Sequence, residues 1–253
     1  FMRSGTMHVF AISGLHIALI AGMLVAVLRV CRMPRRFCPL VVIPLIWLYT
    51  GATGWQASAI RSTIMTSVIV AGWLLARPAD LVNSLSAAAF LILVWEPQQL
   101  FQAGFQLSFA VVLSLALLGP ILDAFRKRLF QFDPWVPDEL RPAWQHRLRK
   151  PIDYLTTSFA VSLAAWLGSL PLVAGYFNLL TPVSLLANLV VVPLSSGALA
   201  CSLGSLAIGP FVPVAGELFN HSAWFFMFWM IRASEWAAAL PAGCLHVGTP
   251  SPL

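Results

Sequence analysis

The sequence predicts an all-α protein, a polytopic transmembrane helical bundle with about seven spans and one further C-terminal helix. Three observations support this class. Of the 253 residues, 59% are hydrophobic. Only 9% are charged, whereas a soluble domain carries about 25% charged residues. The apolar residues also come in runs close to the roughly 20 residues that a helix needs to cross a bilayer.

Eight apolar runs are the candidate helices. In chain order they are 8–28, 38–54, 57–76, 81–95, 100–122, 155–179, 183–209 and 214–240. The second and fourth are short, so they are expected to tilt little or to be partly re-entrant. The last run carries polar residues at helical spacing, so it is either a span with a polar face or a helix lying in the membrane interface.

The basic residues predict the orientation, because Lys and Arg are retained on the cytoplasmic side of a membrane. Twelve of the fifteen lie in connections that fall on one side: four after the first run, one after the third and seven between the fifth and sixth. The N-terminus is therefore expected outside. The hydrophilic connection 123–152 is expected to be a cytoplasmic basic loop that contains Arg126, Lys127, Arg128, Arg147, Arg149 and Lys150.

Arg61 is a charge inside the third apolar run. At about 100° per residue, one apolar stripe of this run is formed by Ile60, Ile64, Val68, Ala71 and Leu75. Ser58 and Ser62 lie on the other side, and Arg61 sits between the two. One interpretation is an arginine near the outer boundary that snorkels to the headgroups. A second is an arginine that braces the fold through a buried partner. A third is a functional residue, which is the default hypothesis for an intramembrane charge.

Other polar side chains are expected at the same depth as Arg61. Gln99, Gln102 and Gln106 share a face of the fifth run, and the runs that carry such clusters all start outside. Residues that only join helices by hydrogen bonds would occur at all depths. Their common depth favours a hydrated outer vestibule that suits an anionic guest, although interhelical hydrogen bonding is an alternative for each residue. The pathway residues are Ser13, His16, Ser58, Arg61, Ser62, Gln102, Gln106 and Asn188.

Several kinds of chemistry lack their sequence motifs. The chain has no GxxxxGK[ST], GxSxG or HExxH, which argues against a P-loop nucleotidase, an α/β-hydrolase and a zinc protease of these types. The histidines form no metal-ligand cluster, and the four cysteines form no CxxC pair. We therefore expect a protein that is not an enzyme and that has no cofactor and no metal.

Four stretches carry a resemblance to a known family. They are "HVFAISGLHIALI" (8–20), "GWQASAIRSTIM" (54–65), "RPADLVNSLSAAAFLILVWEPQQLFQAGFQLSFAVVLSL" (77–115) and "SLLANLVVVPL" (184–194). Together they resemble the competence domain of the ComEC family, the inner-membrane channel for DNA uptake. The third stretch is the most specific, because N-S-L, E-P and G-F-Q-L-S-F occur in order. Arg61 follows the arginine and small-residue pattern of the family.

The resemblance covers about residues 5–210 and implies passage of single-stranded DNA across the bacterial inner membrane into the cytoplasm. The implied partners are single-stranded DNA, membrane lipids and other proteins of the competence machinery. Relatives often add a soluble N-terminal domain and a metallo-β-lactamase-like domain. We expect neither here, and interpret 1–253 as a fragment that forms a single transmembrane competence-type domain. Two alternatives stay open: a secondary transporter or channel for a small anionic solute, and a membrane scaffold that only docks partners.

Overall fold

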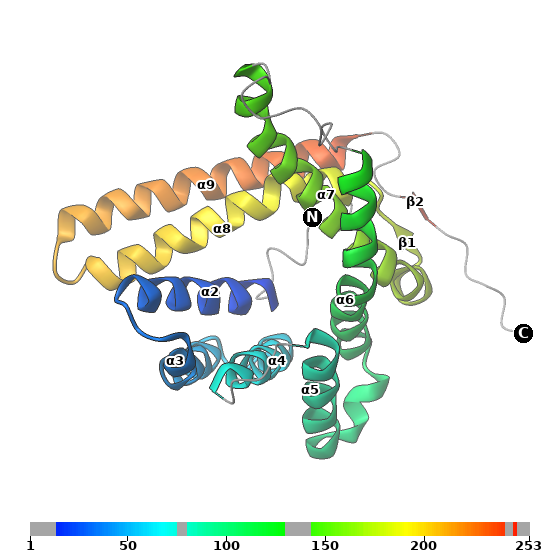
Figure 1. Ribbon diagram of the computed structural model, residues 1–253, viewed down its shortest axis with the longest axis horizontal. Coiled ribbons are helices and arrows are strands. Elements are labelled where there is room, and N and C mark those ends of the chain that lie inside the picture. The colour runs from blue at the N-terminus through cyan, green and yellow to red at the C-terminus, as the bar shows by residue number, and fades with distance from the viewer. Residues whose placement is uncertain (1–13, 75–79, 130–142, 241–244, 247–253) are drawn as a thin grey trace, which may run out of the picture.

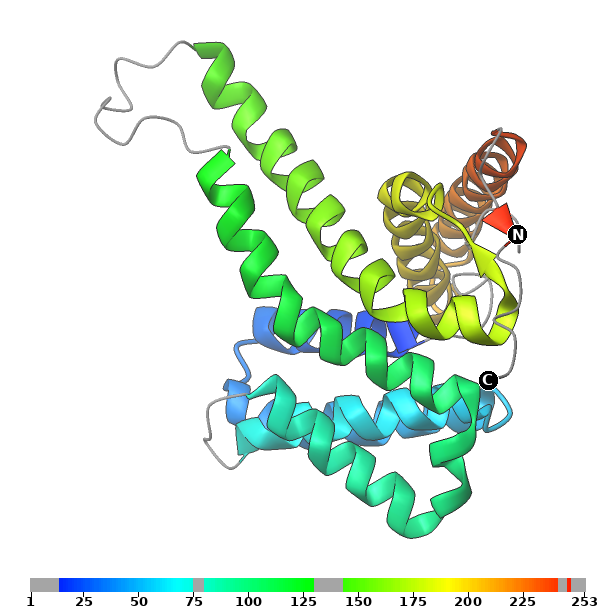
Figure 2. The ribbon, with the colours of Figure 1, turned by 90° about the vertical axis from the view of Figure 1, so that its right-hand side faces the viewer.

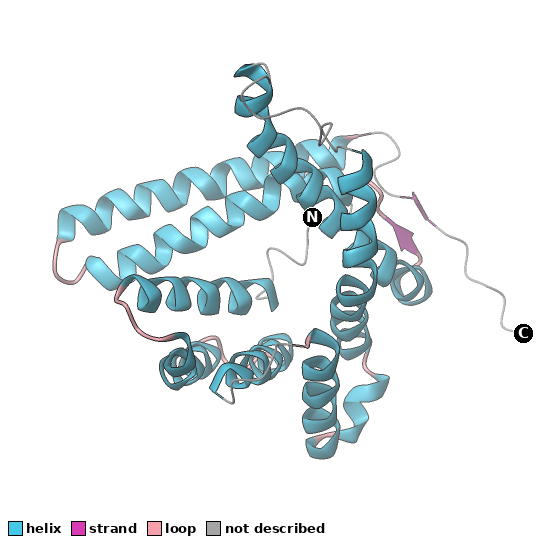
Figure 3. Cartoon of the chain, viewed as in Figure 1, coloured by secondary structure: helices cyan, strands magenta, loops and turns pink. Residues whose placement is uncertain are grey.

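The computed structural model describes residues 14–74, 80–129, 143–240 and 245–246, with side chains from 150 onward in the third range. Nearly all of these residues are helical, as expected (Figures 1 and 3). The α-helices are α2 (Gly14–Val30), α3 (Cys38–Ala52), α4 (Ala57–Leu74), α5 (Leu81–Trp95), α6 (Ala103–Leu129), α7 (Ala143–Phe177), α8 (Ser184–Ile208) and α9 (Pro213–Ala239). The short elements are the 3-10 helices η1 (Arg35–Phe37) and η2 (Pro97–Phe101) and the antiparallel strands β1 (Leu179–Leu180) and β2 (Leu245–His246).

Each of the eight expected apolar runs corresponds to one helix. Four of these helices, α4, α6, α8 and the Lys150–Phe177 part of α7, are long and apolar enough to cross a membrane. α2 and α5 are shorter apolar helices. With 15 residues each, α3 and α5 extend about 22 Å, less than the roughly 30 Å hydrocarbon core. The all-helical class is therefore confirmed, while the expected number of seven spans stays a prediction.

Neighbouring helices form three groups. α8 and α9 make one antiparallel hairpin, α6 and α7 make another, and α2 lies between α8 and the α3–α4 pair (Figure 1). α8 and α9 lie along the plane of Figure 1 and are seen end-on in Figure 2, whereas α4 is foreshortened in Figure 1 and lies across Figure 2. The helices therefore do not all run in one direction. Helices that all begin on the outer side of a membrane can therefore still have N-terminal ends that lie far apart.

The main hydrophobic core lies among α2, α3 and α4, and it fixes the position of the helix that carries Arg61. Ile17 of α2, Val42 and Ile46 of α3 and Ala59 of α4 are completely buried there. On its other side, α4 packs against α5. Burying apolar side chains on two sides of a helix holds it in place.

The α8–α9 hairpin is joined along a buried stripe of α9. Gly216, Ala223, Met230 and Ala237 are buried at intervals of seven residues on α9, and such a stripe faces a single neighbouring helix. The polar side chains of Glu217, His221 and Arg232 are exposed. Although α9 is not among the four helices that meet the length and hydropathy of a span, both interpretations of this helix stay open.

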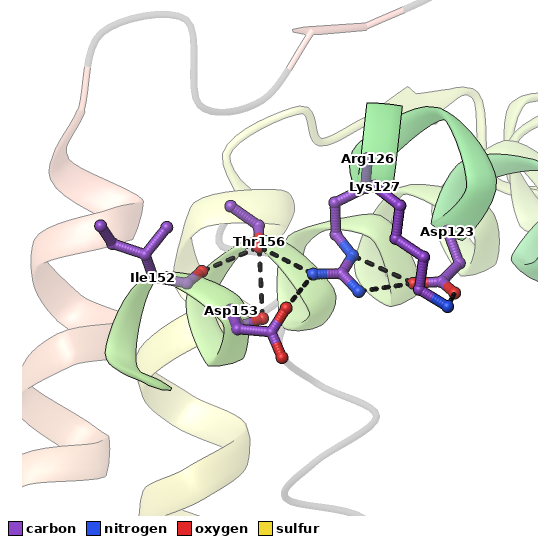
Figure 4. A network of polar contacts seen from close by, with 6 residues as sticks. All are labelled: Asp123, Arg126, Lys127, Ile152, Asp153 and Thr156. Atoms are coloured by element: carbon purple, nitrogen blue, oxygen red, sulfur yellow. Dashed lines mark hydrogen bonds and ion pairs between the residues drawn. The ribbon is translucent and has the colours of Figure 1, made fainter. Parts of the chain in front are cut away.

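The two described ends of the connection expected at 123–152 are helical, and residues 130–142 lie outside the described residues. α6 continues to Leu129 and α7 begins at Ala143. Ion pairs explain the extension (Figure 4): Asp123 accepts from Arg126 at 2.7 Å and from Lys127 at 2.7 Å, at helical spacings that stabilise a turn. Arg126 also pairs with Asp153 of α7. The charged ends of α6 and α7 are thus joined to each other.

Candidate functional site

Arg61 is buried inside the protein. It lies five residues into α4, and only 7% of its surface is exposed. At helical spacing it shares a face with Met65, whereas Ala59 and Thr63 are buried on the opposite face, which packs on α2 and α3. A side chain that snorkels to the headgroups keeps its charged end in water. The guanidinium of Arg61 instead lies against residues of η2 and α6.

The guanidinium has few partners. Its Nη1 donates one long hydrogen bond of 3.4 Å to Oε1 of Gln99, which is a neutral amide. Its Nε is buried without a hydrogen-bond partner in the described part of the chain, and no ion pair is formed with a described carboxylate. A buried charge that lacks a counter-ion is costly, typically about 3–5 kcal/mol when a partner is removed. The arrangement is therefore suited to receive an anion.

Gln99 in turn is held by an acidic residue. Its Nε2 donates to Oε2 of Glu96 at 2.8 Å, so the amide of Gln99 lies between the cation of Arg61 and the carboxylate of Glu96. Glu96 itself is exposed. The segment from Glu96 to Gln99 therefore provides a neutral contact for the arginine and keeps the nearest carboxylate one side chain further away.

Gln106 anchors the same segment to two helices. Its Nε2 donates to the carbonyl oxygen of Leu100 in η2 at 2.9 Å, and its Oε1 accepts from the Tyr176 hydroxyl of α7 at 2.7 Å. Gln106 thus positions η2, and with it Gln99, relative to α6 and α7. It acts as a structural link between Arg61 and the α6–α7 hairpin.

The three glutamines do not share one helix face, contrary to the expectation from the sequence. Pro97 begins the 3-10 turn η2, and Gln102 has an extended backbone with φ −82° and ψ 128° that separates η2 from α6. Only Gln106 lies on α6. Gln102 is exposed, and no hydrogen bond in the described part of the structure joins its side chain to the Arg61 group.

Ser58 and Ser62 lie where α2 approaches α4. Ser62 donates its hydroxyl to the carbonyl oxygen of Ser58 at 2.9 Å. Gly14 of α2 is so close that a Cβ built on it would stand 2.6 Å from Oγ of Ser62. His16 is half-buried two residues further along α2. These residues border the turn of α4 that carries Arg61, and Ser62 serves helix packing.

Two of the expected pathway residues are not joined to this group. Ser13 lies outside the described residues. Asn188 is half-buried on α8, and its Oδ1 is buried without a hydrogen-bond partner among the residues described. No hydrogen bond in this part of the chain connects Asn188 to Arg61. Hydrogen bonds therefore link Arg61 to Gln99 and link Gln106 to the same segment, while no such bond in the described residues joins the side chains of Gln102 and Asn188 to Arg61.

The basic residues near the α6–α7 connection differ in availability. The side chain of Arg126 is 11% exposed and is held by Asp123 and Asp153. Lys127 is exposed and paired with Asp123, while Arg128 and Lys150 are exposed. The side chains of Arg147 and Arg149 are not described. Arg126 therefore clamps two helices, and the exposed residues are the ones that can meet a ligand.

Comparison with known proteins identifies the family. The family model for competence protein matches residues 1–253. The chain belongs to the competence protein family. It is 28% identical over 193 residues to ComE operon protein 3 of Bacillus subtilis (strain 168), which covers 76% of this chain and 22% of that protein. The chain therefore spans about a fifth of the length of this relative. No solved structure matches.

The sequence did not reveal all of the residues around Arg61. Gln99 stood out as polar, but its contact with α4 was not predictable, and Glu96, Gly104 and Tyr176 were missed. Pro97 was the available signal, because a proline following a helix end favours a new turn and would have separated Gln99 from α6. No group of His, Cys, Asp and Glu suited to a metal ion lies within the described residues.

Proposed function

We propose that this chain forms part of the inner-membrane path by which single-stranded DNA enters the cytoplasm during natural competence. Membership of the competence protein family and similarity to ComE operon protein 3 support a role in DNA uptake. The helices of spanning length support a membrane location. The observation that carries the proposal furthest is the buried guanidinium of Arg61, which has no carboxylate partner among the described residues.

The charge of Arg61 suits a polyanion. A nucleic acid strand carries one phosphate per nucleotide, so a path through a bilayer requires positive potential and polar contacts along its length. Two unit charges 4 Å apart interact by about 4 kcal/mol at an effective dielectric constant of 20. An arginine already neutralised by a carboxylate would offer much less. The neutral contact with Gln99 leaves the charge available to a phosphate group.

The exposed basic residues would act at the other end of the path. With the N-terminus outside, the α6–α7 connection lies in the cytoplasm, where Arg128 and Lys150 attract an emerging strand. Single-stranded DNA, membrane lipids and other proteins of the competence machinery are the proposed partners. The chain itself would perform no chemistry and would use no cofactor, so the energy for transport would come from elsewhere in that machinery.

The experiment is a DNA-uptake assay with the gene that encodes this chain intact, deleted and restored. Cells receive fluorescent duplex DNA, and the label is counted at the cell surface and, after nuclease treatment of intact cells, in the cytoplasm. Deletion is expected to abolish cytoplasmic label while surface label stays, and restoration is expected to return it. Unchanged cytoplasmic label in the deletion strain would refute the proposal. Loss of surface label as well would assign the chain to DNA capture instead of passage.

A further inference from the structure

The N-terminus of α6 is an open end of a long helix beside Arg61. The carbonyl oxygen of Gln102 accepts from the backbone N–H groups of Phe105 and Gln106 at 3.0 and 3.1 Å. The N–H groups of Ala103 and Gly104 have no hydrogen-bond partner within the described part of the chain. Such groups and the aligned peptide dipoles of a helix of 27 residues favour an anion at this end.

Arg61 points at the same place. A Cβ built on Gly104 would stand 3.0 Å from Nη2 of Arg61, so the guanidinium lies directly beside the first turn of α6. Gly104 is exposed while Arg61 is buried. At this point the guanidinium lies next to an exposed residue without a side chain, at the open end of α6.

We propose that Arg61 and the first turn of α6 form a binding site for one phosphate group. The guanidinium and the N–H groups of Ala103 and Gly104 would donate hydrogen bonds to its oxygens, a combination that is selective for oxyanions. This inference rests on the function proposed above in one respect: the phosphate group is assigned to the backbone of the passing DNA strand.

Gln99 determines whether this site is open to an anion. As an amide it holds the guanidinium through a single hydrogen bond, whereas a carboxylate at this position would form a strong charge-assisted pair with it. Glu96, which accepts from Gln99, adds a negative charge nearby and so limits the affinity of the site. A transport path needs binding that is favourable enough to admit the strand and weak enough to release it.

Two substitutions close the site in different ways. Gln99→Glu adds a competing carboxylate, and Gly104→Leu places a side chain over the guanidinium without changing any charge. Matched controls are Gln98→Glu, which adds the same charge at an exposed neighbour, and Gly119→Leu on α6, where the added Cβ meets no other atom within 4 Å. Helicity and elution volume of the purified variants report whether each one folds.

The assay measures binding of a fluorescent oligothymidylate to the purified full-length protein in a phosphate-free maltoside detergent. Inorganic phosphate and phosphatidylglycerol vesicles are tested in parallel, because a free anion or a lipid headgroup offers the same chemistry. We expect Gln99→Glu and Gly104→Leu to weaken oligonucleotide binding by about tenfold or more, with both controls close to the original protein. If Gly104→Leu does not fold, Gln99→Glu decides the outcome, because it keeps the size of the side chain and adds no atom beside the buried guanidinium.

The outcomes separate the site from the proposed function. Oligonucleotide binding that is equal in the original protein and in Gln99→Glu would overturn the phosphate site and leave the uptake function standing. Binding of phosphate or phosphatidylglycerol that is lost in Gln99→Glu, with no oligonucleotide binding in any variant, would support the site and contradict its assignment to DNA.

Discussion

The hydrogen bond between Thr50 and Thr63 gives a stability prediction that can be worked out from the structure. Both side chains are completely buried, and their hydroxyl oxygens are 2.6 Å apart. Thr50 uses its one proton to donate to the carbonyl oxygen of Ile46 at 2.8 Å. Since a hydroxyl has a single proton to donate, Thr63 must be the donor in the bond between the two threonines. This bond joins α3 to the face of α4 that lies opposite to Arg61.

The two single substitutions are therefore expected to differ. Thr63→Val removes the donor and leaves Thr50 bonded to Ile46, so the free energy of unfolding should fall by about 1 kcal/mol. Thr50→Val leaves the hydroxyl of Thr63 buried without this acceptor and should cost about 1–3 kcal/mol. The double variant keeps neither hydroxyl and should cost less than the sum, with a coupling energy of about 0.6–1.7 kcal/mol, the range for such bonds in membrane proteins.

The assay is reversible unfolding of the purified protein in mixed micelles, followed by helicity, for the original protein and the three variants. Additive effects, with a coupling energy below about 0.3 kcal/mol, would refute the contact between Thr50 and Thr63. DNA uptake per inserted molecule should be unchanged in all three variants. The account requires that α3–α4 packing can be weakened without affecting transport. A fall in DNA uptake per inserted molecule would contradict this requirement.

Three further results are expected. Gly14→Ala should destabilise the protein by about 1–3 kcal/mol, because its Cβ would stand 2.6 Å from Oγ of Ser62. Adding Ser62→Ala should restore part of this loss in the same unfolding assay. If the double variant is no more stable than Gly14→Ala, the contact between Gly14 and Ser62 is contradicted. Asp153→Asn removes the ion pair between α6 and α7 and should lower the free energy of unfolding by about 1 kcal/mol or less, because the side chain of Asp153 is 64% exposed. A larger loss would contradict this exposure of the ion pair. Cysteines introduced at Gln145 and Gln98 should react with an impermeant maleimide from opposite sides of the membrane, and labelling of position 145 from outside intact cells would overturn the orientation.

Helix positions followed well from the sequence, while their contacts did not. The run 81–95 matches α5 at both ends, 38–54 extends two residues beyond α3, and 57–76 begins at the same residue as α4. Apolar runs and the polar residues between them are local properties of a sequence. The direction in which one helix crosses another depends on packing between distant segments, which a single sequence does not report.

The candidate site shows the same division. Arg61 was identifiable because a charge in an apolar run is rare. Its contact with Gln99 spans 38 residues of sequence, and Gly104 is one of 16 glycines without any local mark of its position beside the guanidinium. Arg126 was assigned to a cytoplasmic basic loop because of its charge and its place in a hydrophilic connection. Its partner Asp153 lies on another helix, and only the fold brings the two together.

The central claim is that the charge of Arg61 acts on DNA, and Arg61→Gln tests it most directly. The control Arg232→Gln removes an exposed guanidinium from α9, and Arg61→Lys keeps a charge without the planar fork that binds two phosphate oxygens. The measurement is DNA uptake per molecule of protein inserted in the membrane. The account predicts a severe loss in Arg61→Gln, a partial loss in Arg61→Lys and no change in Arg232→Gln. Uptake by Arg61→Gln equal to that of the original protein, at normal abundance, would contradict it.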